Sequence, residues 1–209
     1  MNLAVEHRII PGKMQKAIKY TIFKTRWGYF GLAGTEQGIL RTHLPVPARE
    51  IVKSNLLSNI DSADYDKNLF KYVQQQIIAY FDGASIDFSP CIPIVLDGFS
   101  GFIKSVLIAC REIPFGKTIS YQGLGEKLHR PCSARAVGSA LAKNPAPLLI
   151  PCHRVIRSNG RIGGFSAPGG PSLKTKLILH ESACRQLGGM RQSILLRRGY
   201  GGQETMVCL

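Results

Sequence analysis

Short runs of β-prone residues, separated by turn residues, make up the first part of the chain. Three runs follow one another closely, and they cover residues 17–25, 27–34 and 38–44. Runs of this length with such short connections predict an antiparallel meander.

Mostly apolar side chains then recur at helical spacing within residues 67–81, where Asp82-Gly83 ends the pattern. The spacing predicts one helix, and the stripe consists of Leu69, Tyr72, Val73, Gln76, Ile77 and Tyr80. A polar stretch with prolines over residues 83–97 follows, as is typical of a connection between domains. We therefore expect an α/β domain over residues 1–97.

Helical patterns replace the strand patterns in the second part of the chain, and they cover residues 100–112, 119–129, 132–144 and 171–182. Ser120 and Ser133 are candidate N-caps, and Asn144-Pro145 ends the third pattern. Two short helices joined by a tight turn predict a helix-turn-helix, although any pair of antiparallel helices gives the same pattern. We expect a mainly helical domain over residues 98–184.

The helix predicted over residues 132–144 carries small side chains at most positions, namely Ala134, Ala136, Gly138, Ser139, Ala140 and Ala142. Val137 and Leu141 would anchor it to the core, and Arg135 lies roughly opposite them. A helix this bare can approach a DNA backbone and enter the minor groove, which is about 6 Å wide. Tight packing between helices uses small residues equally well, so both interpretations stay open.

Two segments near the end of the chain have weak periodicity. Residues 157–172 are rich in turn residues and basic at their start, which favours a β-hairpin wing followed by a flexible loop. Residues 185–209 are rich in Gly and Arg, and we expect them to form a basic, mobile tail.

The net charge of +14 over 209 residues is unevenly distributed. Residues 1–100 contain 11 Lys and Arg against 9 Asp and Glu, whereas residues 101–209 contain 16 against 4. A basic half of this kind favours a polyanionic partner, with nucleic acid ahead of a membrane surface. A basic surface that is only solvated is the remaining alternative.

Membrane and export signals are missing from the sequence. No apolar run approaches the about 18 residues of a membrane span, and the N-terminus lacks the apolar core of a signal peptide. We therefore expect a cytoplasmic protein, or a nuclear one if the source is eukaryotic, with no membrane partner.

The six cysteines form no Cys-x-x-Cys pair and no tight Cys/His cluster. This spacing argues against a disulfide framework and against a structural zinc site, so we expect no metal. One cysteine stands out, because "LLIPCHRVI" (residues 148–156) sets Cys152 directly before His153. Adjacent side chains on extended backbone point to opposite faces. A direct thiolate–imidazolium pair is therefore disfavoured, and His153 would act on Cys152 through a water or after a sharp turn.

Four motifs carry a family resemblance. They are "ISYQGL" (119–124), "ARAVG" (134–138), "NP" (144–145) and "PCHRV" (151–155). On these motifs, from about residue 98 to 183, the chain resembles the alkylguanine-DNA alkyltransferases, also called methylated-DNA–protein-cysteine methyltransferases. The resemblance is looser in the N-terminal part. It implies a ribonuclease-H-like α/β domain followed by a winged-helix domain with a helix-turn-helix.

The resemblance also implies a reaction, which is the transfer of an alkyl group from guanine O6 in duplex DNA to Cys152 after the damaged base is flipped. His153 would deprotonate Cys152 through a bound water, and Glu181 would orient the imidazole. Asn144 would brace this network, and Tyr121 would donate a hydrogen bond to the departing guanine. The thioether product offers water no acyl carbon to attack, so the protein would act once.

The other residues implied by the resemblance contact DNA or the flipped base. Arg135 would fill the gap in the base stack, and its helix would contact DNA through Ser133, Ala134, Ala136 and Gly138. The substrate pocket would include Pro147, Val155, Phe165 and Ser166. The implied partner is double-stranded DNA that contains alkylated guanine, and the protein would act as a monomer without a cofactor.

The chain departs from the family pattern at two positions, and two other classes of protein stay open as alternatives. An aromatic residue that the family tends to carry is Leu107 here, and a loop aromatic, often Tyr, is Phe165. A protein that binds alkylated bases without transfer typically lacks the cysteine that is present here. A thiol hydrolase would need Cys152 and His153 in direct contact together with an oxyanion hole. Retention of the alkyl group on the protein separates the three classes.

Overall fold

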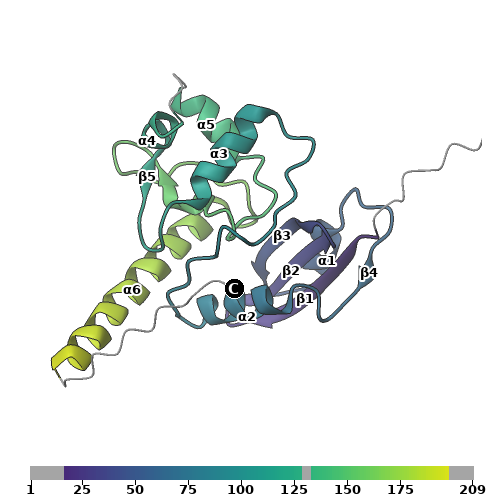
Figure 1. The fold of residues 1–209 in the computed structure, drawn as a ribbon, viewed down its shortest axis with the longest axis horizontal. Coiled ribbons are helices and arrows are strands. Elements are labelled where there is room, and N and C mark those ends of the chain that lie inside the picture. Colours follow the sequence, from purple (N-terminus) through teal and green to yellow (C-terminus); the bar gives the residue numbers. More distant parts are fainter. Residues whose placement is uncertain (1–16, 129–132, 198–209) are drawn as a thin grey trace, which may run out of the picture.

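The computed structural model describes residues 17–128 and 133–197, with side chains up to Arg185. A small sheet with two helices forms the N-terminal part, and a group of short helices forms the C-terminal part beside it (Figure 1). A long C-terminal helix begins beside the C-terminal part and extends away from it (Figure 1). This α/β domain followed by a mainly helical domain confirms the fold class that the sequence predicts.

The sheet contains the predicted meander, and its strands are β1 (Lys19–Thr25), β2 (Gly28–Thr35), β3 (Gly38–Val46) and β4 (Asp64–Tyr65). The first three are antiparallel, and β4 adds two residues parallel to β1, so that the order is β3-β2-β1-β4. Gly28 opens β2 at φ +126°, where a Cβ would lie 2.6 Å from the carbonyl oxygen of Val46. A glycine is therefore required at this turn.

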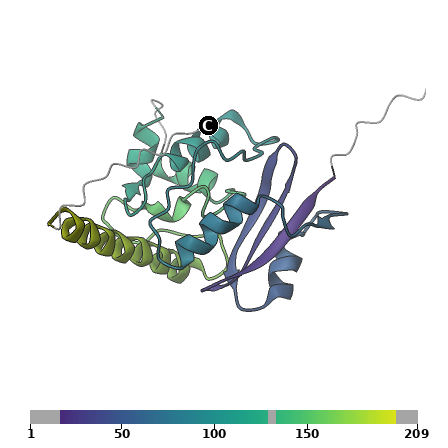
Figure 2. The ribbon, with the colours of Figure 1, turned by 60° about the horizontal axis from the view of Figure 1, so that its bottom comes forward.

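Two helices cover opposite faces of the sheet (Figure 2). Helix α1 (Arg49–Leu56) was not predicted, and it buries only Val52 and Leu56. Helix α2 (Lys71–Phe81) starts four residues later than predicted, because Phe70 before it has left-handed backbone at φ 49°. Tyr72 was expected in the apolar stripe but is 57% exposed. The buried face consists of Val73, Gln74, Ile77, Tyr80 and Phe81 instead.

The helices of the C-terminal domain begin close to their predicted positions, and they are α3 (Gly101–Arg111), α4 (Tyr121–Glu126) and α5 (Ala134–Leu141). The hydroxyl of Ser120 caps α4 by accepting from the backbone N–H of Gly123 at 2.9 Å. Ser133 caps α5 by accepting from the N–H of Ala136 at 3.2 Å. Residues 129–132, which join the two helices of the predicted helix-turn-helix, lie outside the described residues.

A short pair of strands and a turn complete the C-terminal domain beside these helices. Strand β5 (Ile119–Ser120) pairs in parallel with β6 (Val155–Ile156). A turn follows β6, and it is closed by a hydrogen bond from the backbone N–H of Arg157 to the carbonyl of Arg161 at 3.0 Å. Residues 161–166 do not continue it as a strand, so the expected β-hairpin is reduced to this turn. Gly163 and Gly164, which disfavour a strand, lie where the second strand was expected.

The last helix, α6 (Gly170–Arg197), is much longer than the predicted 171–182. Residues 185–197 were expected to belong to a mobile tail and are helical here, whereas residues 198–209 lie outside the described residues. The apolar face of α6 packs on the core through Leu177, which is buried, and Leu173, which is partly buried.

One apolar core crosses the boundary between the two domains. It joins Phe30 and Phe81 of the first domain to Val106 and Leu107 of the second. Backbone hydrogen bonds add to this contact, because Thr42 of β3 donates its N–H to Pro145 and its hydroxyl to Pro147, at 3.0 and 2.8 Å. The edge of the sheet therefore holds the loop that leads to Cys152.

Candidate active site

Cys152 opens a single 3₁₀ turn, Cys152–Arg154, between Pro151 and strand β6. The turn points the side chains of Cys152 and His153 in different directions. Cys152 is 7% exposed and borders a cavity, whereas His153 is fully buried on the core side. This divergence was expected from extended backbone, whereas the backbone here is a 3₁₀ turn.

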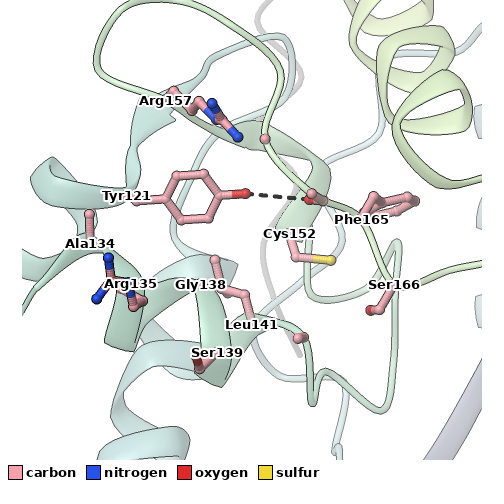
Figure 3. Close-up of a pocket in the computed structure, with 13 residues that line it drawn as sticks. Tyr121, Ala134, Arg135, Gly138, Ser139, Leu141, Cys152, Arg157, Phe165 and Ser166 are labelled. Carbon is pink, nitrogen blue, oxygen red and sulfur yellow. Dashed lines mark hydrogen bonds between the residues drawn. The ribbon is translucent and has the colours of Figure 1, made fainter.

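The cavity in front of Cys152 has a volume of about 640 Å³. Helix α5 forms one wall, Tyr121 of α4 and Arg157 form another, and the loop 163–166 closes the far side (Figure 3). The sulfur of Cys152 points into the space between Tyr121 and Ser166 (Figure 3). A volume of this size lies within the range of small-molecule binding sites and is large enough for a nucleobase.

A side-chain hydrogen-bond donor lies beside the Cys152 thiol. Asn144 Nδ2 lies 3.1 Å from Sγ and also donates to the carbonyl of Ile150 at 2.8 Å. Burial raises the pKa of the Cys152 thiol, and the Asn144 hydrogen bond and the Lys174 charge offset part of this increase. The thiol is therefore protonated near neutral pH, and a base must remove its proton before it can act as a nucleophile.

His153 is the nearest candidate for that base. Its Nε2 lies 2.7 Å from Glu181 Oε1, so Nε2 carries the proton and donates it to the carboxylate. Its Nδ1 is buried and has no hydrogen-bond partner among the described residues. Burial lowers the pKa of the imidazole, while Glu181 acts in the opposite direction. The ring is therefore neutral near pH 7, with a free acceptor at Nδ1.

Glu181 organises a buried network behind the turn. Both of its oxygens accept from Arg154 Nε, at 3.2 and 3.0 Å, and Oε1 also accepts from the Tyr80 hydroxyl at 2.9 Å. Burial would raise the pKa of the Glu181 carboxyl, but His153 and Arg154 lower it to about 2. The carboxylate therefore stays charged and holds His153 in one tautomer.

Tyr121 projects over the cavity next to a buried lysine. Lys174 Nζ donates to Tyr121 Oη at 3.1 Å and to the carbonyl of Gly164 at 3.4 Å. Gly163 and Gly138 lie against the tyrosine ring, and a Cβ at Gly163 would come within 2.7 Å of its Cε2. Burial raises the pKa of the Tyr121 phenol, so its proton is retained near neutral pH.

The structure places many of the predicted site residues around this cavity, but not all of them. Ala134, Arg135, Gly138, Phe165 and Ser166 line it. Pro147 instead borders a neighbouring cavity of about 190 Å³, which also reaches Cys152, Phe165 and Ser166.

Three of the other predicted residues lie outside the cavity wall. Ser133 caps α5, Ala136 is partly buried in that helix, and the Val155 side chain is in the core. Val155 pairs through its backbone with Ile119 of β5.

Sequence reasoning missed four residues of this region. Arg154 was within reach of prediction, because it belongs to the "PCHRV" motif and follows His153 directly. Tyr80 and Lys174 lie on helices at positions that read as an ordinary core residue and an ordinary solvated lysine. Arg157 was noticed only as part of a basic segment.

The described residues contain neither a candidate metal site nor a membrane-spanning helix. Among them, no group of three or more His, Cys, Asp or Glu side chains is arranged to hold a metal ion. None of the described helices is long and apolar enough to cross a membrane.

These features define a cysteine-nucleophile site set in a helical domain, and comparisons identify the family. The DNA-binding domain of 6-O-methylguanine DNA methyltransferase matches residues 101–183, and the ribonuclease-like domain of the same family matches residues 18–96. The chain therefore belongs to the 6-O-methylguanine DNA methyltransferase family.

Individual relatives agree with this assignment. A methylated-DNA–protein-cysteine methyltransferase of Methanosarcina acetivorans is 32% identical over 79% of this chain and 99% of its own. Its counterpart in Cricetulus griseus is 33% identical over 82% of this chain and 88% of its own. A crystal structure of Mycobacterium tuberculosis OGT in complex with DNA is 28% identical, with a TM-score of 0.66, and the match covers 79% of this chain and 94% of that one.

Proposed function

We propose that this protein repairs DNA by moving the alkyl group from O6 of an alkylated guanine to Cys152, once per molecule. The observation that carries the proposal is the Cys152 thiol at a base-sized cavity, with the buried His153–Glu181 pair behind it. The relatives named as methylated-DNA–protein-cysteine methyltransferases support the same reaction. A solved relative in complex with DNA supports DNA as the partner.

The first step is activation of the nucleophile. His153 Nδ1 takes the Cys152 proton through one bridging water, and Glu181 stabilises the imidazolium that forms. Asn144 donates to the sulfur and favours the thiolate over the thiol. A hydrogen bond to a charged acceptor contributes about 1.5–3 kcal/mol, so this donor lowers the cost of deprotonation substantially.

The second step is displacement at the alkyl carbon. A bond forms from Cys152 sulfur to that carbon, the bond from the carbon to O6 breaks, and its electron pair stays on the guanine. Tyr121 gives its phenolic proton to the guanine anion. Lys174 can only donate, so it occupies a lone pair of Tyr121 Oη. The phenolic proton points to the carbonyl of Gly164 at 3.4 Å, and the guanine takes the place of this long acceptor contact.

The base reaches the cavity by flipping out of the duplex. Helix α5, with Ala134, Gly138 and Ser139 along the cavity, presents a surface without bulky side chains. Arg135 is exposed on the same helix and fills the gap that the flipped base leaves in the stack. Flipping costs a few kcal/mol, which such an insertion partly offsets.

The proposal also covers the oligomeric state, the cofactors and the location of the protein. We propose that it acts as a monomer, without a cofactor or metal, in the cytoplasm or, in a eukaryote, in the nucleus. The division into residues 1–97 and 98–184 assigns DNA binding and alkyl transfer to the second domain. A thiol hydrolase is disfavoured, because it would need a direct contact between the imidazole and the thiol, and His153 Nδ1 has no hydrogen-bond partner among the described residues.

Repair can be followed on the DNA. A duplex with one O6-methylguanine inside a restriction site becomes cleavable only after the methyl group is removed. The protein should restore cleavage in proportion to the amount added, whereas Cys152→Ala should restore none and still bind the duplex. Cys91→Ala, at an exposed cysteine away from the cavity, is the matched control and should restore cleavage fully. Repair by Cys152→Ala would refute the proposal.

A further inference from the structure

Two arginine side chains border the cavity from different elements. Arg135 comes from helix α5, whereas Arg157 begins the turn after β6, and the two guanidinium groups lie on either side of Tyr121 in Figure 3. In the proposed reaction Arg135 fills the gap in the base stack, whereas Arg157 has no role.

The guanidinium of Arg157 has no partner among the described residues. Within the described part of the chain, no hydrogen bond or ion pair uses it, whereas the other arginine of this region, Arg154, is held by Glu181 and Asp87. The described residues that line the cavity include two arginines and no carboxylate. An exposed cation with no internal partner at the edge of such a cavity is suited to an anion from outside.

The backbone of the turn fixes the position of that cation. Arg157 donates its N–H to the carbonyl of Arg161 and accepts at its own carbonyl from Gly160, both at 3.0 Å. Its neighbour Ile156 pairs with Ser120, the residue directly before Tyr121. The backbone of Arg157 is therefore connected, through two short paired strands, to Tyr121, which donates to the guanine.

A nucleotide whose base reaches Cys152 leaves its sugar and phosphates at the cavity edge. Helix α5 occupies one side of that edge, and Arg157 occupies another. We propose that Arg157 binds a phosphate that flanks the flipped nucleotide, and that it thereby makes the site selective for nucleotides over free bases and nucleosides. This inference rests on the proposed function. The planar guanidinium can present two parallel N–H donors to one phosphate, which a lysine cannot do.

The test compares two small substrates that differ only in their phosphates. They are O6-benzyl-2′-deoxyguanosine and its 3′,5′-bisphosphate, each reacted with the full-length protein in excess while alkylation of Cys152 is followed. The wild-type protein should react faster with the bisphosphate than with the nucleoside. In Arg157→Ala the ratio of the two rate constants should fall by about ten- to a hundredfold, as expected for a lost charge-assisted hydrogen bond.

Two further variants sharpen the result. Arg157→Lys should retain part of the preference, because it keeps the charge and loses the paired geometry. Arg26→Ala removes an exposed arginine between β1 and β2 and should leave the ratio unchanged.

The possible outcomes distinguish a failure of the proposed function from a failure of the phosphate contact. If the wild-type protein takes no alkyl group from either substrate or from methylated duplex DNA, the proposed function itself is wrong. If it reacts but Arg157→Ala has the wild-type ratio, the phosphate contact is refuted and the function stands. An equal loss on both substrates would also refute the contact, because Arg157 would then act on Tyr121 or on the folded cavity.

Discussion

His153 Nε2 lies 2.7 Å from Glu181 Oε1, and the two side chains are only 1% and 2% exposed. This hydrogen bond places the imidazole proton on Nε2 and leaves Nδ1 as the acceptor. The residue next to the nucleophile can therefore work as a base without touching it. The same pair ties the reaction to the stability of the fold, because Glu181 also holds the buried Arg154.

The rate of transfer should depend on pH through His153. Burial lowers the pKa of His153 below 6.5, so the neutral base persists as the pH falls to that value and is lost only under more acidic conditions. The single-turnover rate constant should therefore decline with a midpoint below 6.5. In Glu181→Gln the midpoint should move further down, because the carboxylate that favours the imidazolium is gone. A wild-type midpoint above 6.5 would contradict the assignment of His153 as the base.

Stability should be linked to the ionisation of Glu181. The pKa of this group in the folded state, about 2, lies below its ordinary value of 4.5, so its contribution is present above pH 4.5 and is lost as the pH falls through 2. A shift of this size corresponds to about 3 kcal/mol. Glu181→Gln should lower the free energy of urea unfolding by about 3–5 kcal/mol at pH 6, since it leaves Arg154 without its buried charged partner and with only the exposed Asp87.

Unfolding measurements at acidic pH test whether the charge of Glu181 provides this stability. The difference in unfolding free energy between the wild-type protein and Glu181→Gln should shrink between pH 4.5 and the lowest pH at which both remain folded. A difference that does not change with pH would mean that the carboxylate charge is not what stabilises the network.

Loss of Asn144 should weaken the nucleophile. Asn144 is the side chain that donates to the Cys152 sulfur, at 3.1 Å, and it lowers the pKa of a thiol that burial raises. Asn144→Ala should raise that pKa further and slow transfer by about ten- to a hundredfold at pH 7. Asn68→Ala, at an exposed position in the N-terminal domain, is the control. The Cys152 pKa can be read from the pH dependence of iodoacetamide alkylation, and an unchanged value would exclude this role for Asn144.

Gly163 should be required for the position of Tyr121. A Cβ at this residue would lie 2.7 Å from Tyr121 Cε2 and 2.9 Å from its Cζ, which is closer than side chains tolerate. Gly163→Ala should displace the ring and slow transfer from both duplex DNA and free benzylguanine, since donation to the leaving guanine is needed for each. Gly101→Ala has open space around its Cβ and serves as the control. Unchanged rates in Gly163→Ala would mean that Tyr121 is not the donor.

Local signals in the sequence predicted much of the fold. The three strands of the meander follow from short β-prone runs, and Ser120 and Ser133 were recognised as caps because their hydroxyls satisfy free N–H groups of the next turn. Helix α1 escaped prediction, since it is short and buries only two side chains. The start of α2 was misplaced, because the left-handed backbone of Phe70 is set by its surroundings and not by its own preference.

The site was harder to derive, because its contacts join residues that are far apart in the chain. The Tyr80 hydroxyl reaches Glu181 across 101 positions, and the Arg154 guanidinium reaches Glu181 across 27. Lys174 illustrates the limit of pattern reasoning. A lysine on an amphipathic helix reads as solvated, and only the folded chain reveals that its ammonium group is buried against Tyr121.

The central claim, transfer to Cys152, is tested most directly by intact-protein mass spectrometry with peptide mapping. The full-length protein is incubated with a large excess of duplex DNA that contains O6-methylguanine. The mass should increase by one methyl group per chain and then stay constant, because the thioether offers no route back to the thiol, and the methyl group should map to Cys152. A methyl group on Cys91, Cys110 or Cys184, or continued repair by a protein whose mass does not change, would contradict the account.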